Sequence, residues 1–281
     1  MAAERKMPVL VGVDGSEQSL VAAQWAVMDG DLRTAPVRLV TVVDDASRDD
    51  AALELLSRVA EQCRSDRPRV EVFDEIKHGL PIENLVWASS GAQLLVVGSR
   101  GRGQVAEAVL GSVSTAVAMH AHCPVVVVRD RRTSFAVGPV VVGVDDSAPA
   151  RAALRFAFEE AAARQTDLLA MHIWRPVLAE YSWIETPQAG AAWFSLDDAQ
   201  RELDEQLATW REKYPNVEVR NVVRYGHPVE ELTKAASHGQ LLVVGHRGIG
   251  GFKQLLLGSV AHGVLHHSEC PVAIVRSSLT P

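Results

Sequence analysis

Two glycine-rich segments with the same spacing are the part of this chain best suited to chemistry, because they can hold an anion. They are Gly98-Ser-Arg-Gly101, followed after nine residues by Gly111-Ser112, and Gly245-His-Arg-Gly248, followed after nine residues by Gly258-Ser259. Each segment follows the apolar run Leu-Leu-Val-Val, and each Gly-Ser opens a stretch with the pattern of an apolar helix. Backbone N–H groups and a helix N-terminus then converge on one pocket, which is how proteins commonly hold phosphate.

An aspartate closes the first predicted strand of each half of the chain. Asp14 follows Val-Leu-Val-Gly-Val, and Asp145 follows Val-Val-Val-Gly-Val. Open α/β sheets bind ligands at the carboxyl ends of their strands, where a carboxylate can accept hydrogen bonds from sugar or base hydroxyls. Alternatively, each aspartate only caps the next helix, because Asp-Gly-Ser and Asp-Asp-Ser are good turn and N-cap sequences.

The elements that must position these residues alternate between strand and helix. In the first half we predict strands at about 8–13, 37–43, 69–75, 93–98 and 124–129, and helices at about 17–29, 50–64, 81–90 and 112–120. In the second half we predict strands near 139–145, 168–173, 217–223, 240–245 and 272–276, and helices near 148–164, 197–213, 228–237 and 259–267. The strands are continuous apolar runs, which predicts parallel sheets covered on both faces, with right-handed crossovers.

The internal repeat extends over nearly the whole chain. Gly-Leu-Pro81 matches Gly-His-Pro228, and Cys123-Pro-Val matches Cys270-Pro-Val, in the same order and with similar spacing. A length of 281 residues also fits two domains. We predict domains at 1–133 and 134–281, with the charged, non-periodic stretch from Arg129 to Gly138 as the linker.

The composition and net charge of the chain disfavour some classes of binding partner. A net charge of −7 disfavours binding to nucleic acid or to an anionic membrane. No segment has the pattern of a signal peptide or a membrane span, so we expect a cytoplasmic protein.

The three cysteines are too few for a disulfide framework, and Cys123 and Cys270 are interpreted as small buried side chains. The histidines cluster near the predicted C-termini of the last helices, where the helix dipole favours them, so no metal site is expected; they are His120, His122, His262, His266 and His267.

The glycine motif, combined with an aspartate that closes the first strand, resembles the ATP-binding members of the universal stress protein family in its tandem-domain form. The resemblance covers nearly all of the chain. It implies two tandem Rossmann-like domains of the adenine nucleotide alpha hydrolase-like type, each with a five-stranded parallel sheet in the order 3-2-1-4-5 and four flanking helices. That strand order would place Asp14 beside Gly98.

The resemblance also implies the residues of two ATP sites. Asp14 and Asp145 would bond the ribose, and Val42 and Ile173 would meet the adenine. The phosphates would lie against Gly98, Gly101, Gly111, Ser112 and Val113 in the first half and against Gly245, Gly248, Gly258, Ser259 and Val260 in the second. The expected cofactor is ATP at both sites, with Mg²⁺ held by its phosphates. We also expect a Cβ at Gly111 or Gly258 to clash with phosphate or to forbid the required φ.

Two departures separate the halves. Gly15 becomes Asp146 in the second half, and Thr41-Val42 becomes His172-Ile173. The extra carboxylate beside Asp145 either repels phosphate or faces solvent. The cations in or near the loops either neutralise phosphate or are solvated; they are Arg100, Arg102, Arg247 and Lys253.

A binding module is the favoured function: a regulator in stress response or growth control whose nucleotide state alters its shape or partners. No P-loop and no kinase-type set of residues is present, so no catalytic residues are assigned. The alternative is a slow ATPase or an adenylating enzyme, although the Ser-Gly-Gly-x-Asp-Ser loop of adenylating enzymes is missing. A scaffold with empty pockets is the third hypothesis, and two intact glycine loops disfavour it.

The fifth strands, Val125–Val128 and Val272–Val275, are apolar and would lie at open sheet edges, which favour pairing. The resemblance implies that family domains meet through this edge, so the two halves can pair as an intramolecular pseudo-dimer. The second half also carries extra residues at about 175–195, next to or within which lie Trp174, Tyr181, Trp183, Trp193 and Phe194. We expect these aromatic residues to form a surface for a homodimer or, alternatively, a lid over the second site in a monomer.

Overall fold

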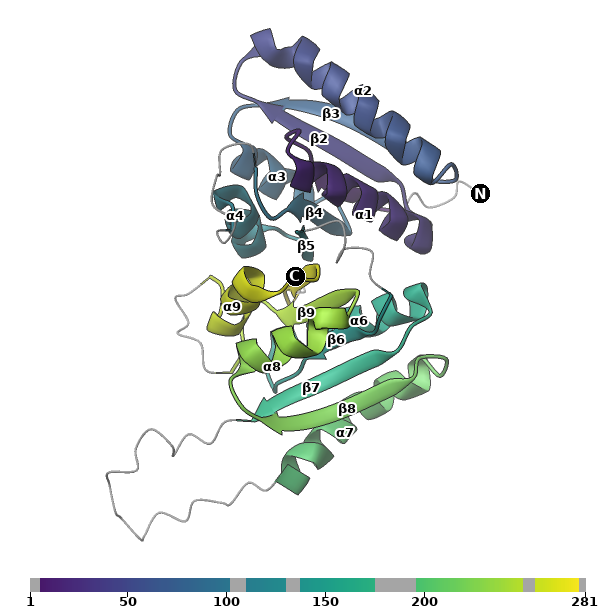
Figure 1. The fold of residues 1–281 in the computed structure, drawn as a ribbon, viewed down its shortest axis with the longest axis vertical. Coiled ribbons are helices and arrows are strands. Elements are labelled where there is room, and N and C mark those ends of the chain that lie inside the picture. Colours follow the sequence, from purple (N-terminus) through teal and green to yellow (C-terminus); the bar gives the residue numbers. More distant parts are fainter. Residues whose placement is uncertain (1–5, 102–109, 130–136, 175–195, 250–255, 278–281) are drawn as a thin grey trace, which may run out of the picture.

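The computed structural model describes residues 6–101, 110–129, 137–174, 196–249 and 256–277. Two α/β domains lie end to end and contribute five strands each to one ten-stranded sheet (Figure 1). The strand order is β3-β2-β1-β4-β5-β10-β9-β6-β7-β8, so each half has the predicted order 3-2-1-4-5. The predicted boundary at 133–134 and the aromatic stretch at 175–195 lie outside the described residues.

The first domain contains β1 (Val9–Gly12), α1 (Glu17–Arg33), β2 (Val37–Val43), α2 (Asp49–Asp66), β3 (Val72–His78), α3 (Pro81–Ser89), β4 (Leu94–Gly98), α4 (Ser112–His120) and β5 (Val125–Val128). The second contains β6 (Val140–Gly143), α6 (Ala148–Arg164), β7 (Leu168–Trp174), α7 (Leu196–Lys213), β8 (Val219–Tyr225), α8 (Pro228–Ala235), β9 (Leu241–Gly245), α9 (Ser259–His267) and β10 (Val272–Val275). The predicted alternation of strand and helix is therefore confirmed.

The third strand of each half begins later than we predicted. The apolar residues Val70 and Val217 were assigned to these strands, but each N–H donates to a carbonyl in the preceding turn, that of Arg67 or Tyr214. Both side chains are buried. They belong to the core although they lie in turns after α2 and α7. A buried apolar residue in a turn gives the same local sequence pattern as a buried residue in a strand, so the pattern could not separate the two.

The sheet carries helices on both faces, which explains its uninterrupted apolar strands. Val9 and Val11 of β1 pack in the core that includes Trp25 of α1, whereas Leu10 packs in the opposite core with Leu85 of α3. This alternation follows from the pleat of a strand. Because both faces of β1 are covered, neither face offers room for a polar side chain, and chemistry is confined to the strand ends.

The two domains meet through β5 and β10, which pair antiparallel at the centre of the molecule (Figure 1). In the register of this pair, Val126 lies opposite Ala273 and Val127 opposite Val272. All other neighbouring strands run parallel, for example β4 with β5 and β9 with β10. The pairing covers the apolar fifth strand of each half, so neither is left as an open edge.

Four charged side chains from α1 and α6 form a second contact between the domains. Arg33 Nε lies 2.6 Å from Asp29 Oδ2, and Arg164 Nη2 lies 2.7 Å from Asp29 Oδ1 and 2.8 Å from Glu160 Oε2. Arg33 also bonds Glu160. Each arginine therefore joins one carboxylate of its own domain and one of the other. We call this set the interdomain charge cluster.

The interdomain charge cluster is buried, so the loss of any one of its charges should be costly. The side chains of Asp29 and Glu160 are 1% and 2% exposed. Burial and the nearby charge of Glu160 together raise the pKa of Asp29 to about 6, although Arg33 and Arg164 act to lower it. Burial also opposes ionisation of Glu160, but Arg33 and Arg164 outweigh it and lower its pKa. The cluster is charge-balanced only when both arginines are present.

Two aromatic rings complete this contact across the domain boundary. The Arg33 guanidinium lies 5.3 Å from the ring centroid of Phe156, and that of Arg164 lies 5.0 Å from the ring of Trp25. In both cases the arginine and the ring belong to different domains. Cation–π attraction strengthens when the pair is removed from water, so these contacts add to the docking of the domains.

We expect Arg164→Met to destabilise the protein by about 3–5 kcal/mol, because it leaves a buried carboxylate without its compensating charge. Arg155→Met on the same helix is the matched control. Arg155 forms an exposed pair with Glu159 at 4.0 Å, and such pairs contribute only about 0–1 kcal/mol. Chemical denaturation measures both changes in the free energy of unfolding. Equal effects in the two variants would contradict the importance of the buried cluster.

Candidate functional site

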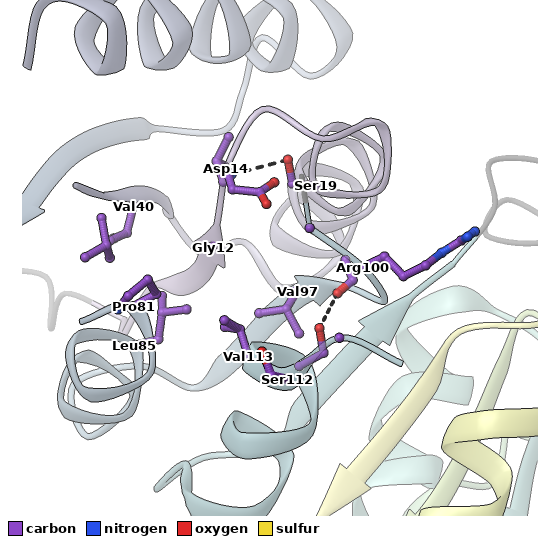
Figure 2. A pocket seen from close by; sticks show the side chains of 16 residues that line it. Gly12, Asp14, Ser19, Val40, Pro81, Leu85, Val97, Arg100, Ser112 and Val113 are labelled. Atoms are coloured by element: carbon purple, nitrogen blue, oxygen red, sulfur yellow. Dashed lines mark hydrogen bonds between the residues drawn. The ribbon is translucent and has the colours of Figure 1, made fainter. Parts of the chain in front are cut away.

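The first candidate site is a cavity of about 430 Å³ at the carboxyl ends of β1, β2 and β4 (Figure 2). Its lining includes all seven residues predicted for the first half: Asp14, Val42, Gly98, Gly101, Gly111, Ser112 and Val113. The topology explains this convergence, since β1 lies between β2 and β4 and connections from these strands leave on opposite faces. Residues separated by up to about 100 positions thus share one crevice.

Asp14 sets the turn between β1 and α1. Its Oδ1 accepts hydrogen bonds from the Ser16 N–H at 2.9 Å and from Ser16 Oγ at 2.6 Å. Ser16, not Asp14, is the N-cap of α1, because its Oγ accepts from the Ser19 N–H at 3.3 Å. Asp14 is therefore not the helix cap, although the turn expected of Asp-Gly-Ser is confirmed, and the carboxylate that holds this turn through Oδ1 also lines the cavity.

The aspartate of each half lies against the second glycine of its loop. A Cβ built on Gly101 would lie 2.6 Å from Asp14 Oδ2, and one on Gly248 would lie 2.4 Å from Asp145 Oδ2. Asp145 Oδ2 also accepts a hydrogen bond from the Ile249 N–H at 3.1 Å. Only glycine leaves space for this approach, so the carboxylate and the loop are fitted to each other in both halves.

The first glycine of each loop has a different task, which is close packing of the backbone. A Cβ on Gly98 would lie 2.7 Å from the backbone carbon of Gln18 in α1. A Cβ on Gly245 would lie 2.8 Å from that of Pro149 in α6. These glycines let the end of the fourth strand touch the first turn of the first helix. The contact brings the glycine loop and the aspartate to one place.

The glycines before α4 and α9 are N-cap residues without a capping side chain. Gly111 has φ −67° and Gly258 has φ −72°, which any residue adopts. The expectation that a Cβ would forbid φ at these positions is therefore wrong. Ser112 and Val113 of the first turn line the first cavity, and Ser259 and Val260 line the second. Their N–H groups have no intrahelical acceptor, and the helix dipole makes this end attractive to anions.

The opposite side of the first cavity is apolar. Val40, Val42, Pro81 and Leu85 form it. Figure 2 shows Val40, Pro81 and Leu85 across the cavity from Ser19. Pro81 and Leu85 were not assigned to the site from sequence, although they lie in a stretch that the second half repeats. The cavity thus offers a polar end for charged groups and an apolar end for a flat ring.

The second candidate site is a cavity of about 520 Å³ at the corresponding place in the second domain. It contains all seven residues predicted for that half: Asp145, Ile173, Gly245, Gly248, Gly258, Ser259 and Val260. Trp174, at the end of β7, also lines it. The centroid of the Trp174 ring lies 6.2 Å from that of the Tyr225 ring. The duplicated sequence therefore produces two separate cavities of similar construction.

The two departures between the halves leave the predicted lining intact. Thr41 Oγ1 donates to the Val13 carbonyl at 2.8 Å, and His172 Nδ1 lies 3.0 Å from the corresponding Val144 carbonyl. Asp146 does not line the second cavity, since its Oδ1 accepts from Gln206 Nε2 of α7 at 3.0 Å. Of the two alternatives for this carboxylate, repulsion of phosphate is not supported.

The cations predicted in or near the loops differ in what the structure shows of them. Arg100 and Arg247 line their cavities, but Figure 2 shows the Arg100 side chain pointing away from Asp14 and the lining residues near it. Arg102 and Lys253 lie outside the described residues.

Two further lining residues were missed from sequence: Ser19, whose Oγ accepts hydrogen bonds from the Asp14 and Gly15 N–H groups, and Ser114, whose Oγ donates to the Gly98 carbonyl at 2.6 Å. Both are alanine in the second half, so the repeat gave no signal for them.

The cysteines and histidines contribute no second centre in the described part of the chain. Burial raises the pKa of Cys63 and Cys123 to about 12 and that of Cys270 to about 11, so these thiols stay protonated. The rings of His262 and His266 lie 4.5 Å apart. Among the described residues no three His, Cys, Asp or Glu side chains are grouped to hold a metal ion. None of the described helices is both long and apolar enough to cross a membrane.

Comparison with known proteins gives consistent matches along the chain. The model of the universal stress protein family matches residues 7–129 and again 137–276. A universal stress protein of Mycobacterium tuberculosis (strain ATCC 25618 / H37Rv) is 35% identical over 294 residues, which cover 97% of each chain. One of Mycolicibacterium smegmatis is 35% identical over 289 residues, with 95% and 96% covered. The crystal structure of a universal stress protein from Archaeoglobus fulgidus has a TM-score of 0.76 at 19% identity and covers 97% of this chain and 99% of its own.

The two kinds of loop glycine should differ in how much stability their substitution costs. Gly98→Ala drives a Cβ into the backbone of α1, so we expect a loss of about 1–3 kcal/mol in the free energy of unfolding. Gly101→Ala meets only the end of the Asp14 side chain, so we expect a smaller loss. Chemical denaturation of both variants makes the comparison. A larger loss for Gly101→Ala than for Gly98→Ala would contradict the division of tasks.

Proposed function

The chain belongs to the universal stress protein family, and from that premise we propose that it binds one ATP molecule in each of its two domains. The observation that carries the proposal is the fit between a carboxylate, a glycine loop and an uncapped helix N-terminus, repeated in both halves. A cavity with one anion-attracting end and one apolar end suits a nucleotide. Its site residues are those that we predicted from sequence.

The phosphate end of the proposed site is built from backbone. The first turn of α4 presents N–H groups at Ser112 and Val113, and Gly101 lets the loop backbone lie directly against Asp14. Backbone donors at a helix N-terminus stabilise negative charge without requiring a basic side chain. This supports phosphate at the loop even though the protein as a whole carries a net charge of −7.

The nucleoside end is assigned by elimination within the same cavity. Asp14 accepts hydrogen bonds and is the carboxylate among the described lining residues, so it is the acceptor for ribose hydroxyls. Val42 and its neighbours offer apolar surface for adenine. Because Asp14 Oδ1 is engaged by Ser16, the described lining of the first cavity provides few oxygen ligands for a cation. We therefore propose that Mg²⁺ is held by the phosphates, as it commonly is in nucleotide sites.

We propose regulation rather than catalysis as the use of the bound nucleotide. Among the described lining residues of the first cavity, Asp14 and Arg100 are the titratable ones, and Oδ1 of Asp14 is engaged by Ser16. Ser114 Oγ donates to a backbone carbonyl. General-base catalysis needs a group positioned to accept a proton. The lining therefore favours a nucleotide-dependent regulator, which fits the stress-response role that the family name denotes.

Calorimetric titration with ATP and Mg²⁺ should give two sites per chain. Asp14→Ala and Asp145→Ala should each weaken one site by about 10- to 100-fold, because a hydrogen bond to a charged group contributes about 1.5–3 kcal/mol. Asp146→Ala is the matched control, since that neighbouring carboxylate lies outside the cavity and its loss should leave affinity unchanged. A stoichiometry near zero for folded, nucleotide-stripped protein would refute the proposal. Rapid release of ADP would refute the regulatory part alone.

We also propose a domain division at 1–133 and 134–281 and a homodimer of whole chains. The division agrees with the separate family matches at 7–129 and 137–276. For the homodimer, light scattering at micromolar concentration should give twice the monomer mass, and replacing Trp183 and Trp193 with Ser should reduce it. A monomeric parent would contradict the homodimer, and an unchanged mass in the folded variant would remove these tryptophans as its anchors.

A further inference from the structure

Each domain extends one arginine to the last helix of the other domain. Arg276, directly after β10 in the second domain, donates from Nη1 to the carbonyl of Met119 in α4. Arg129, directly after β5 in the first domain, donates from Nη2 to the carbonyl of Leu265 in α9. Because β5 and β10 pair antiparallel, the residue that follows each strand lies beside the other domain. The two arginine contacts are therefore reciprocal.

The accepting carbonyls lie at helix ends, where the backbone lacks its own donors. The last regular bonds at these ends run from Ala121 N–H to the Val117 carbonyl and from Ser268 N–H to the Val264 carbonyl. The carbonyls after them, including those of Met119 and Leu265, lie beyond the last intrahelical donor. A guanidinium at that end satisfies the oxygen and complements the helix dipole.

The same helices start at the two nucleotide cavities. Both α4 and α9 are nine residues long, and their first residues, Ser112 and Ser259, line the first and second cavities. A helix of this length is not stable by itself, so its position depends on contacts along its length and at its ends. The end away from the nucleotide is held by the other domain.

The guanidiniums are also close to the glycine loops of their own domains. Burial lowers the pKa of Arg276, and Arg247 beside it lowers it further. Burial and Arg100 act in the same way on Arg129. These like-charged neighbours favour displacement of the arginine from its own loop, whereas the carbonyl of the other domain's helix attracts it.

We propose that Arg276 and Arg129 are positioning residues that act on the nucleotide site of the opposite domain, Arg276 by fixing α4 and Arg129 by fixing α9. The proposal rests on the nucleotide sites of the proposed function. Each site is then completed by a residue of the other domain, and the tandem arrangement is a requirement for full affinity.

A local electrostatic role makes the opposite prediction. If Arg276 only adds positive charge near its own loop, its removal weakens the second site, in its own domain. If it positions α4, its removal weakens the first site. The identity of the affected site therefore separates the two roles.

Hydrogen exchange on nucleotide-free protein tests the positioning itself. Arg276→Met should accelerate exchange in the last turn of α4, near Met119, and leave α9 unchanged, while Arg129→Met should do the reverse. Arg276→Lys retains a cationic donor and should restore part of the protection. Exchange that rises only in the arginine's own domain, or in neither helix, would overturn the proposal. This measurement does not depend on whether the protein binds ATP.

Calorimetry with ATP and Mg²⁺ in single-site backgrounds tests the consequence for binding. In the Asp145→Ala background, which reports the first site, Arg276→Met should lower affinity by about 3- to 30-fold, the range of indirect coupling. In the Asp14→Ala background, which reports the second site, the same change should have a smaller effect. A larger loss at the second site would overturn the proposal. If the parent protein binds no ATP, the proposed function fails, and the exchange data still decide the positioning role.

Discussion

The structure depends on the close approach of β4 to the first turn of α1, and of β9 to α6. A side chain at Gly98 or Gly245 would penetrate the helix backbone, so each approach requires glycine. The approach places the loop after the fourth strand against the aspartate after the first. This contact determines the approach of each aspartate to Gly101 or Gly248, the position of the next helix, and the cavity itself. One steric constraint, met twice, thus creates both sites.

The two halves use different residues to build one symmetric contact. Trp25, Asp29 and Arg33 on α1 correspond to Phe156, Glu160 and Arg164 on α6, and each arginine joins the acid and the ring of the other domain. Buried charges are costly unless paired, so such a cluster penalises any other docking of the domains. Together with the β5–β10 pair, it explains why the sheet continues across the chain without an open edge at its centre.

The two cavities are similar in construction and different in detail. The second loop buries His246 where the first buries Ser99. Burial lowers the pKa of His246 to about 4, and the nearby charges of Arg276 and Arg247 contribute, so this imidazole is neutral near pH 7. The second cavity also has Trp174 in its wall, and the first has Ser114 bonded to Gly98. Duplication has therefore kept the backbone cradle and changed the side chains around it, which gives the two sites different surroundings for one ligand class.

The sequence by itself determined the alternation of strands and helices and the two glycine loops, and its family resemblance implied the strand order and the seven lining residues of each cavity. The alternation and the loops are local features, because apolar runs, helix periodicity and glycine spacing are each written in consecutive residues and were duplicated in the chain. Only the tertiary structure decided the partners of Gly98, the burial of Val70 and Val217 in turns, and the reach of Arg129 and Arg276 into the other domain. These depend on which distant segments meet when the sheet and its helices pack, and local sequence patterns carry no record of such contacts.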